Sequence, residues 1–272
     1  MKITECVIIF FALLLSVKSF ASQGCAKSRI SFITDSHGVG PFGDNMDRWL
    51  LTFSDFELHT YALGGSSPFW FLRGENGFTT PWAFFYNSCS DGAYPSISQR
   101  RGISAKSQDI KKMLAYDHSH PFNRDLVIFE QGSNVPGENS VYKNQARDLA
   151  LATRRASPDS VCFWISAPRM IKISDAQMAE VNTFINQGLI EAEVILKKEF
   201  PENKNPACYF INSQKYGSYP TNFPAALDGV HYPFPWTCSA DEAARHLPKC
   251  TDYTLPWVNG IKSEMIQILK SL

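Results

Sequence analysis

Apolar residues follow two different periods along the chain, one typical of strands and one typical of helices. Five short runs rich in β-branched and aromatic residues, each bounded by turn residues, predict strands at 29–34, 56–63, 126–130, 161–165 and 208–211. Longer segments with apolar residues at helical spacing predict helices at 44–53, 105–116, 140–156, 176–200 and 257–269. The aromatic and glycine-rich stretch 64–102 is predicted to be a long loop.

Alternation of strands with helices is typical of a parallel sheet that carries helices on both faces. The sequence therefore predicts a single α/β domain with three layers and a central parallel sheet of five strands. Ligands bind to such sheets at the carboxyl ends of the strands. Residues that follow the strands are thus the first candidates for chemistry.

The N-terminal segment has the pattern of a secretory signal peptide. Lys2 is followed by an apolar run at 6–15 and by small residues before a cleavage site that we expect after Ala21. We expect residues 1–21 to be removed and 22–272 to form the domain. A lipid anchor on Cys25 is the weaker alternative, because no aliphatic residue stands in the usual place before it. Export to the periplasm or out of the cell is therefore predicted.

Composition and charge narrow the functional classes. The chain has 272 residues, of which 44% are hydrophobic and 19% are charged, which is an ordinary globular composition. Its formal net charge of zero gives no indication of nucleic-acid binding or of attraction to an anionic membrane. We expect no stable membrane insertion of the mature domain.

Six cysteines remain after the signal segment, an even number that suggests disulfides in an exported protein. Cys238 and Cys250 bracket a short loop and are the predicted pair, while the other pairings and the alternative of isolated thiols stay open. No CxxC or HxxxH spacing occurs, so neither a metal nor another cofactor is predicted.

Four short polar segments lie where an active site of such a sheet should be. Ser36 follows the first predicted strand, the glycines at 64–65 follow the second, and Asn134 follows the third. The segment 228–231 lies between the fifth strand and the last helix. Each segment alone is weak evidence, because a serine in such a turn is most often a helix N-cap and glycine pairs are common in turns. Their joint placement indicates an active site.

These residue types match what acyl transfer requires. A serine hydroxyl needs an adjacent base, for which His231 is suited, and an acid such as Asp228 can orient the imidazole. The oxyanion of the tetrahedral intermediate needs hydrogen-bond donors. Three donors are available in the predicted site: the backbone N–H of Ser36, a backbone N–H of Gly64 or Gly65, and the side-chain amide of Asn134.

The order of these blocks resembles the SGNH (GDSL-type) hydrolase family. The resemblance rests on Asp35-Ser36, a following glycine, Gly132-Ser133-Asn134 and the closing Asp228-x-x-His231, and it spans essentially the whole chain after the signal segment. It implies a flavodoxin-like fold and ester hydrolysis without a metal. By the same resemblance Ser36 is the nucleophile, His231 the base and Asp228 its orienter, and Asn134 is an oxyanion donor.

Two positions depart from the family pattern. Thr34 stands where the family usually has glycine, and His37 stands where it often has leucine. His37 is therefore a candidate for substrate contact. The second block offers two glycines, of which Gly65 is favoured as the oxyanion donor, while Gly64 remains a candidate for substrate contact.

Aromatic residues in the long loop suggest the class of substrate. Trp70 and Trp82 follow the second strand, and Trp236 follows the closing block, so all three are candidates for substrate contact. Packing of the loop aromatics into a small core of their own is the equally weighted alternative. With export, an aromatic rim favours an O-acetyl ester on a peptidoglycan or polysaccharide outside the cytoplasm. A lipase-like or general carboxylesterase, a polysaccharide O-acetyltransferase and a non-catalytic glycan-binding module remain open.

Overall fold

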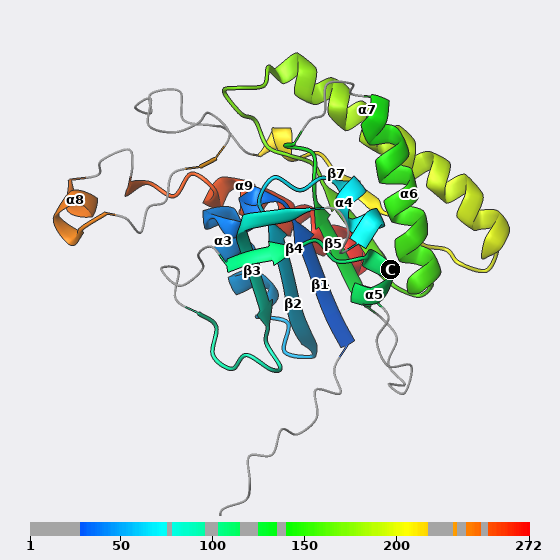
Figure 1. The fold of residues 1–272 in the computed structure, drawn as a ribbon, viewed down its shortest axis with the longest axis horizontal. Coiled ribbons are helices and arrows are strands. Elements are labelled where there is room, and N and C mark those ends of the chain that lie inside the picture. The colour runs from blue at the N-terminus through cyan, green and yellow to red at the C-terminus, as the bar shows by residue number, and fades with distance from the viewer. Residues whose placement is uncertain are drawn as a thin grey trace, which may run out of the picture.

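A seven-stranded sheet lies between two layers of helices (Figure 1). The computed structural model describes residues 28–74, 78–95, 103–114, 125–134, 140–216, 231–232, 238–245 and 250–272. The strand order across the sheet is β4-β3-β2-β1-β5-β6-β7. The predicted α/β class is therefore confirmed.

Five of the strands are parallel and are the five that the sequence predicts. They occupy neighbouring places in the sheet and match the predicted bounds to within one residue: β1 (Ser28–Thr34), β2 (Phe56–Leu63), β5 (Leu126–Glu130), β6 (Val161–Ile165) and β7 (Tyr209–Ile211). Their carboxyl ends consequently lie at one edge of the sheet.

The prediction of a purely parallel five-stranded sheet is wrong at one side of the sheet. β3 (Thr79–Asn87) pairs antiparallel with β2, and β4 (Ile103–Lys106) pairs antiparallel with β3. Both strands fall in or beside the segment predicted to be a loop. The sequence of β3 is rich in threonine and aromatic residues, which suit a strand. Its proline lies within a register shift between Thr80 and Ala83, where the ladder needs no donor.

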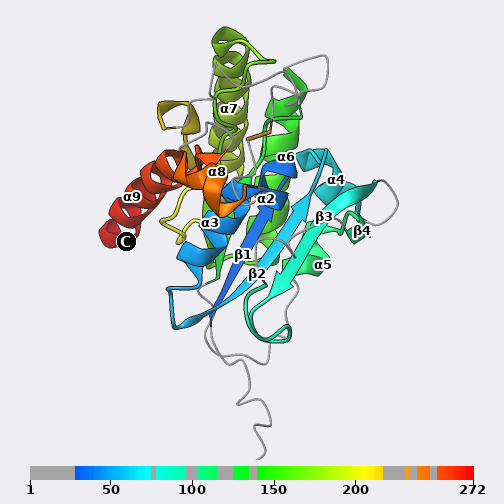
Figure 2. The same cartoon turned by 90° about the vertical axis from the view of Figure 1, so that its left-hand side faces the viewer.

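The helices divide between the two faces of the sheet (Figure 2). The following elements complete the described fold: α2 (Ser36–Val39), α3 (Pro41–Leu50), α4 (Pro68–Arg73), α5 (Ile110–Leu114), α6 (Ser140–Ala156), α7 (Asp175–Glu199), η3 (Ser213–Lys215), α8 (Ala240–Ala244) and α9 (Leu255–Ser271). The predicted helix at 105–116 is thus shorter than expected, because its beginning belongs to β4.

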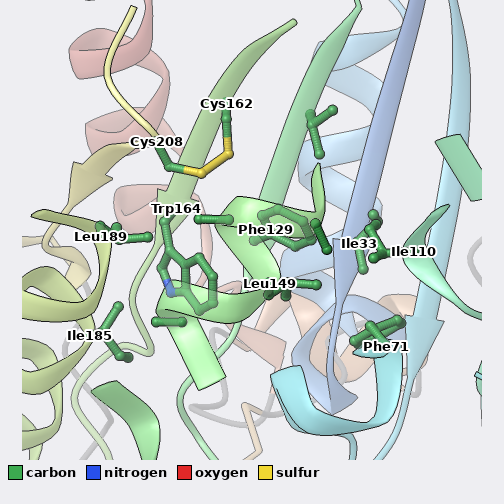
Figure 3. Close-up of a cluster of buried hydrophobic side chains, with 14 of the residues drawn as sticks. Ile33, Phe71, Ile110, Phe129, Leu149, Cys162, Trp164, Ile185, Leu189 and Cys208 are labelled. Atoms are coloured by element: carbon green, nitrogen blue, oxygen red, sulfur yellow. A yellow bond between two sulfur atoms is a disulfide. The ribbon is translucent and has the colours of Figure 1, made fainter. Parts of the chain in front are cut away.

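Side chains of the central strands point alternately to the two faces of the sheet and pack into two separate hydrophobic cores. Ile33 and Phe129 face α4, α5, α6 and α7, where they pack with Trp164, Leu149 and Ile185 (Figure 3). On the opposite face, residues of β1 and β5 pack against α3 and α9, and this core contains the buried side chains Phe32, Ile128, Phe42, Met46 and Trp257. Burial on both faces explains why β5 is apolar except for its last residue, Glu130.

Two disulfides lie in the described part of the chain. Cys238–Cys250 is the predicted pair and closes the segment that contains α8. Cys162–Cys208 fastens the short edge strand β7 to β6, with a Cα–Cα distance of 4.4 Å. Cys89 is disulfide-bonded as well. These bonds are consistent with a location outside the cytoplasm.

No helix among the described residues is both long enough and apolar enough to cross a bilayer.

Gly188 gives a test of the packing between α6 and α7. A Cβ at this position would overlap the backbone carbonyl of Lys143 on α6. A Gly→Ala change inside a helix usually stabilises it by about 1 kcal/mol. Here we expect Gly188→Ala to lower the free energy of unfolding by about 1–3 kcal/mol, because the helices would have to separate. Urea unfolding beside the exposed Gln187→Ala control measures this, and equal stability would contradict the packing.

Candidate active site

Ser36 lies in a sharp turn between β1 and α2. It is half-buried and is the first residue of α2, directly after the N-cap Asp35. The Oδ1 atom of Asp35 accepts a hydrogen bond from the backbone N–H of His37 at 2.9 Å. A Cβ at Gly38 would overlap the side chain of Thr34, so glycine is required for this close approach. The turn therefore presents the Ser36 side chain at the carboxyl edge of the sheet.

Asp35 also connects the Ser36 turn to the end of β5. Its Oδ2 atom accepts a hydrogen bond from the Ser133 hydroxyl and a second from the Asn134 side-chain amide at 3.3 Å. The same amide donates to the backbone carbonyl of Ser66 at 2.7 Å. Three of the four predicted blocks are thus brought together by the fully buried Asp35 carboxyl group and by the Asn134 amide.

Some backbone N–H groups after β2 donate hydrogen bonds within the protein, and others do not. Gly64 donates to the carbonyl of Trp82 at 2.6 Å, and Ser66 donates to the carbonyl of Leu63 at 3.1 Å. Within the described residues the N–H groups of Gly65 and Ser36 make no hydrogen bond. Gly65 has a φ of 77°, a left-handed conformation that favours glycine. This geometry distinguishes Gly65 from Gly64.

His231 lies beside the turn that carries the predicted nucleophile. Its ring centroid is 5.8 Å from that of His37, and its Nε2 atom is buried. In the part of the chain that the structure describes, no hydrogen bond joins Ser36 Oγ to His231. Asp228 and Trp236 lie outside the described residues. The pairing of Ser36 with His231 and of His231 with Asp228 therefore stays a prediction.

His37 is turned into the protein. Its side chain is buried and packs edge-on against the Trp257 ring of α9, with centroids 5.5 Å apart. It also contacts the ring of Tyr232, the residue after His231. In this position the ring supports the wall between α2 and the His231 segment.

A second buried carboxyl group lies under the turn. Glu130, the last residue of β5, accepts a hydrogen bond at Oε2 from the hydroxyl of Thr34 at 2.6 Å. Burial, followed by the charge of Asp35, raises the pKa of Glu130 well above its usual range. Thr34, which stands where the family usually has glycine, is thus hydrogen-bonded to Glu130. A glutamate that ends an otherwise apolar strand is the sequence signal for this pair.

Asp35, His37 and Glu130 each offer one atom that could bind a metal ion, and these three atoms lie within 4.8 Å of one another. Both oxygens of Asp35, however, already accept hydrogen bonds from the protein. We assign no metal to this cluster, because its donor atoms are committed to holding the turn.

The aromatic residues after β2 divide into buried and exposed members. Trp82 is 59% exposed and lies against Gly64. Trp70 is half-buried and stacks on Phe78 with centroids 5.1 Å apart, and Phe78 in turn lies against Gly65. Among the remaining aromatics of this stretch, Phe71, Phe84 and Tyr86 are core residues and the others are half-buried. Some aromatic residues of this stretch are therefore placed for substrate contact, and others pack into the core.

A cavity of about 840 Å³ lies at the opposite edge of the sheet, around the amino ends of β1, β5 and β6. Its lining includes Ser28, Asp125 and Val161. The chemistry-bearing residues described above are all at the carboxyl edge, where parallel sheets carry their ligands. We therefore assign the candidate site to the carboxyl edge and not to this cavity.

Comparison with known proteins gives structural similarity without sequence similarity. No protein-family model matches the chain, and no curated protein is similar to it in sequence. A family two carbohydrate esterase from Cellvibrio japonicus is 13% identical, with 89% of this chain and 62% of the other covered and a TM-score of 0.46. This chain thus spans less than two thirds of that esterase.

Two further solved structures have a similar chain path. The periplasmic domain of a lipopolysaccharide acetyltransferase from Salmonella ser. Paratyphi A is 13% identical, with 93% and 89% covered and a TM-score of 0.47. A family three carbohydrate esterase from Talaromyces cellulolyticus is 11% identical, with 90% and 99% covered and a TM-score of 0.44. At these identities the similarity concerns the fold alone.

Thr34→Val tests whether the hydroxyl of Thr34 supports the site. The change keeps the shape of the side chain but removes the donor to Glu130, leaving a buried acceptor unsatisfied. We expect the free energy of unfolding to fall by about 1–3 kcal/mol. Thr251→Val, at an exposed position, is the control and should change stability by no more than about 0.5 kcal/mol. Equal effects of the two variants on stability would contradict a supporting role of the Thr34 hydroxyl.

Proposed function

We propose that this protein is a serine esterase with Ser36 as its nucleophile. The observation that carries the proposal is the hydrogen bonding of Asp35 to Ser133 and Asn134, which holds the Ser36 turn beside Asn134. Unoccupied N–H groups on Ser36 and Gly65 and the nearby ring of His231 support it further. A lone helix cap would need none of these neighbours.

The proposed reaction begins with proton transfer from Ser36 Oγ to His231 Nε2, as Oγ attacks the ester carbonyl carbon. Asp228 orients the His231 ring and stabilises its charged form. The backbone N–H groups of Ser36 and Gly65 donate to the oxyanion. Both N–H groups of the Asn134 amide have acceptors, on Asp35 and on Ser66, so Asn134 adds a third donor only when one of them turns to the substrate. Collapse releases the alcohol with the proton from His231, and water then hydrolyses the acyl-enzyme by the reverse sequence.

For the substrate we propose an O-acetyl ester on a glycan outside the cytoplasm. The exposed ring of Trp82 and the half-buried stack of Trp70 on Phe78 lie beside the two glycines. Such rings suit sugar faces as well as acyl chains, which leaves a lipase-like or general carboxylesterase as an alternative. The predicted export and the disulfides favour a substrate outside the cytoplasm.

Two other candidates use parts of the same site. A polysaccharide O-acetyltransferase differs only in the acceptor that reaches the acyl-enzyme. A non-catalytic glycan-binding module would use the aromatic rings alone. The presence of Ser36, Asn134, Asp228 and His231 together favours catalysis over binding alone.

Ser36→Ala should abolish hydrolysis of p-nitrophenyl acetate, because no other group supplies the attacking oxygen. We expect a loss in kcat of roughly 10³-fold or more. Ser67→Ala is the matched control, since Ser67 is a nearby serine at the same edge of the sheet whose side chain caps no helix. The assay is p-nitrophenol release. Equal activity of wild type and Ser36→Ala, or inactivity of the wild type toward short acyl esters, would refute the proposal.

Trp82→Ala separates a sugar platform from a general hydrophobic surface. We expect a rise in KM of about three- to tenfold for acetylated glycan, which corresponds to about 1 kcal/mol of lost stacking, with no change for p-nitrophenyl acetate. Ile190→Ala, an exposed apolar residue on α7, is the control. Acid released from acetylated peptidoglycan, acetylated xylan and long-chain esters is measured. A preference for long-chain esters would contradict the glycan assignment.

A further inference from the structure

The candidate site rests on two carboxyl groups that are buried together. Asp35 and Glu130 are both fully buried, and their oxygen atoms lie within 4.8 Å of each other. Two carboxylates at this distance repel strongly in a protein interior, where neither is screened by water. One positive charge or one proton is needed to stabilise the pair.

Within the described residues no lysine or arginine forms an ion pair with Asp35 or Glu130. Thr34 on β1 donates a hydrogen bond to Glu130, the His37 ring on α2 completes the cluster, and the His231 ring lies beyond His37. Tyr142 on α6 donates to the Asn134 carbonyl, and burial raises its pKa, so it stays neutral.

The two carboxyl groups differ in their hydrogen bonds. Asp35 accepts from the His37 N–H, the Ser133 hydroxyl and the Asn134 amide, which are bonds that favour an ionised carboxylate. Glu130 accepts from Thr34 through Oε2, while its Oε1 atom is buried and accepts no hydrogen bond among the described residues. An ionised Glu130 would leave a charged oxygen without a donor, whereas a protonated Glu130 removes that charge and can donate to the neighbouring Asp35 carboxylate.

We propose that Glu130 is a positioning residue that carries a proton, and that this proton keeps Asp35 the only anion beneath the Ser36 turn. The inference rests on the esterase function proposed above. With Glu130 neutral, Asp35 holds the turn and the Asn134 amide in place. When Glu130 ionises, repulsion pushes the Asp35 carboxylate away from its three donors, and Ser36 loses its alignment.

The pH dependence follows from the raised pKa of Glu130 in the folded protein. The unfolded chain loses this proton near the ordinary glutamate pKa of about 4.3. The folded chain keeps it to higher pH, so the folded state binds more protons in the interval between the two values. Glu130 therefore costs stability progressively as pH rises through that interval, and the cost becomes constant once Glu130 ionises in the folded state.

A pH series of urea unfolding tests the proton without any need for activity. Ser36→Ala is compared with the double variant Ser36→Ala/Glu130→Gln, because glutamine resembles the neutral acid. We expect the folding equilibrium constant of the double variant, relative to Ser36→Ala, to rise by about tenfold per pH unit above the ordinary glutamate pKa. Glu199→Gln removes a surface carboxylate paired with Arg155 and should give a flat ratio there. A flat ratio for Glu130→Gln would overturn the inference.

Carbon-13 NMR of glutamate-labelled wild type gives a second measurement that does not depend on whether Glu130→Gln folds. One side-chain carboxyl signal should keep the chemical shift of a protonated acid at a pH where the other glutamates have ionised. Chemical shifts of ionised carboxylates at every glutamate would overturn the proposal.

The rate profile tests the positioning role. In wild type kcat should fall at alkaline pH as Glu130 ionises, and in Glu130→Gln this fall should disappear, whatever the level of kcat at neutral pH. A merely structural glutamate would lower kcat in Glu130→Gln without moving the alkaline limb, which would contradict positioning. An inactive wild type would refute the esterase function, while the unfolding series would still decide the proton.

Discussion

The buried carboxyl group of Asp35 is the interaction on which the candidate site depends. One of its oxygens fixes the backbone of the turn through the N–H of His37, and the other accepts from Ser133 and Asn134 at the end of β5. Two neighbouring parallel strands therefore deliver their end residues to one point. Because Asp35 is fully buried, these hydrogen bonds are protected from competition with water. The conformation at Ser36 is set from both strands at once.

The glycines around Asp35 are explained by close contacts with side chains and by backbone conformation. Gly38 leaves room for Thr34, whose hydroxyl reaches Glu130. Gly65 adopts a left-handed conformation that leaves its N–H unoccupied, whereas Gly64 continues the hydrogen bonding of β2 with β3. The antiparallel strand β3 thus does more than widen the sheet. By accepting from Gly64 through the Trp82 carbonyl, it determines which glycine N–H remains for a ligand.

The five parallel strands and the positions of Ser36 and Asn134 could be predicted from sequence because each depends on a local pattern. Hydrophobic runs mark the strands, and the carboxyl-edge rule places the residues that follow them. β3 was missed because its aromatic residues suit a loop rim as well as a strand, and only pairing with β2 distinguishes the two. The contact of Thr34 with Glu130 joins residues 96 positions apart, which no local pattern reveals.

Labelling with a fluorophosphonate that reacts with activated serine hydroxyls tests the central claim most directly. Peptide mass spectrometry after labelling should find one adduct, on the peptide that contains Ser36, and His231→Ala should strongly slow its formation. Ser67→Ala should label like the wild type. An adduct on another serine, or no adduct at any concentration that labels a known serine esterase, would contradict the assignment of Ser36 as the nucleophile.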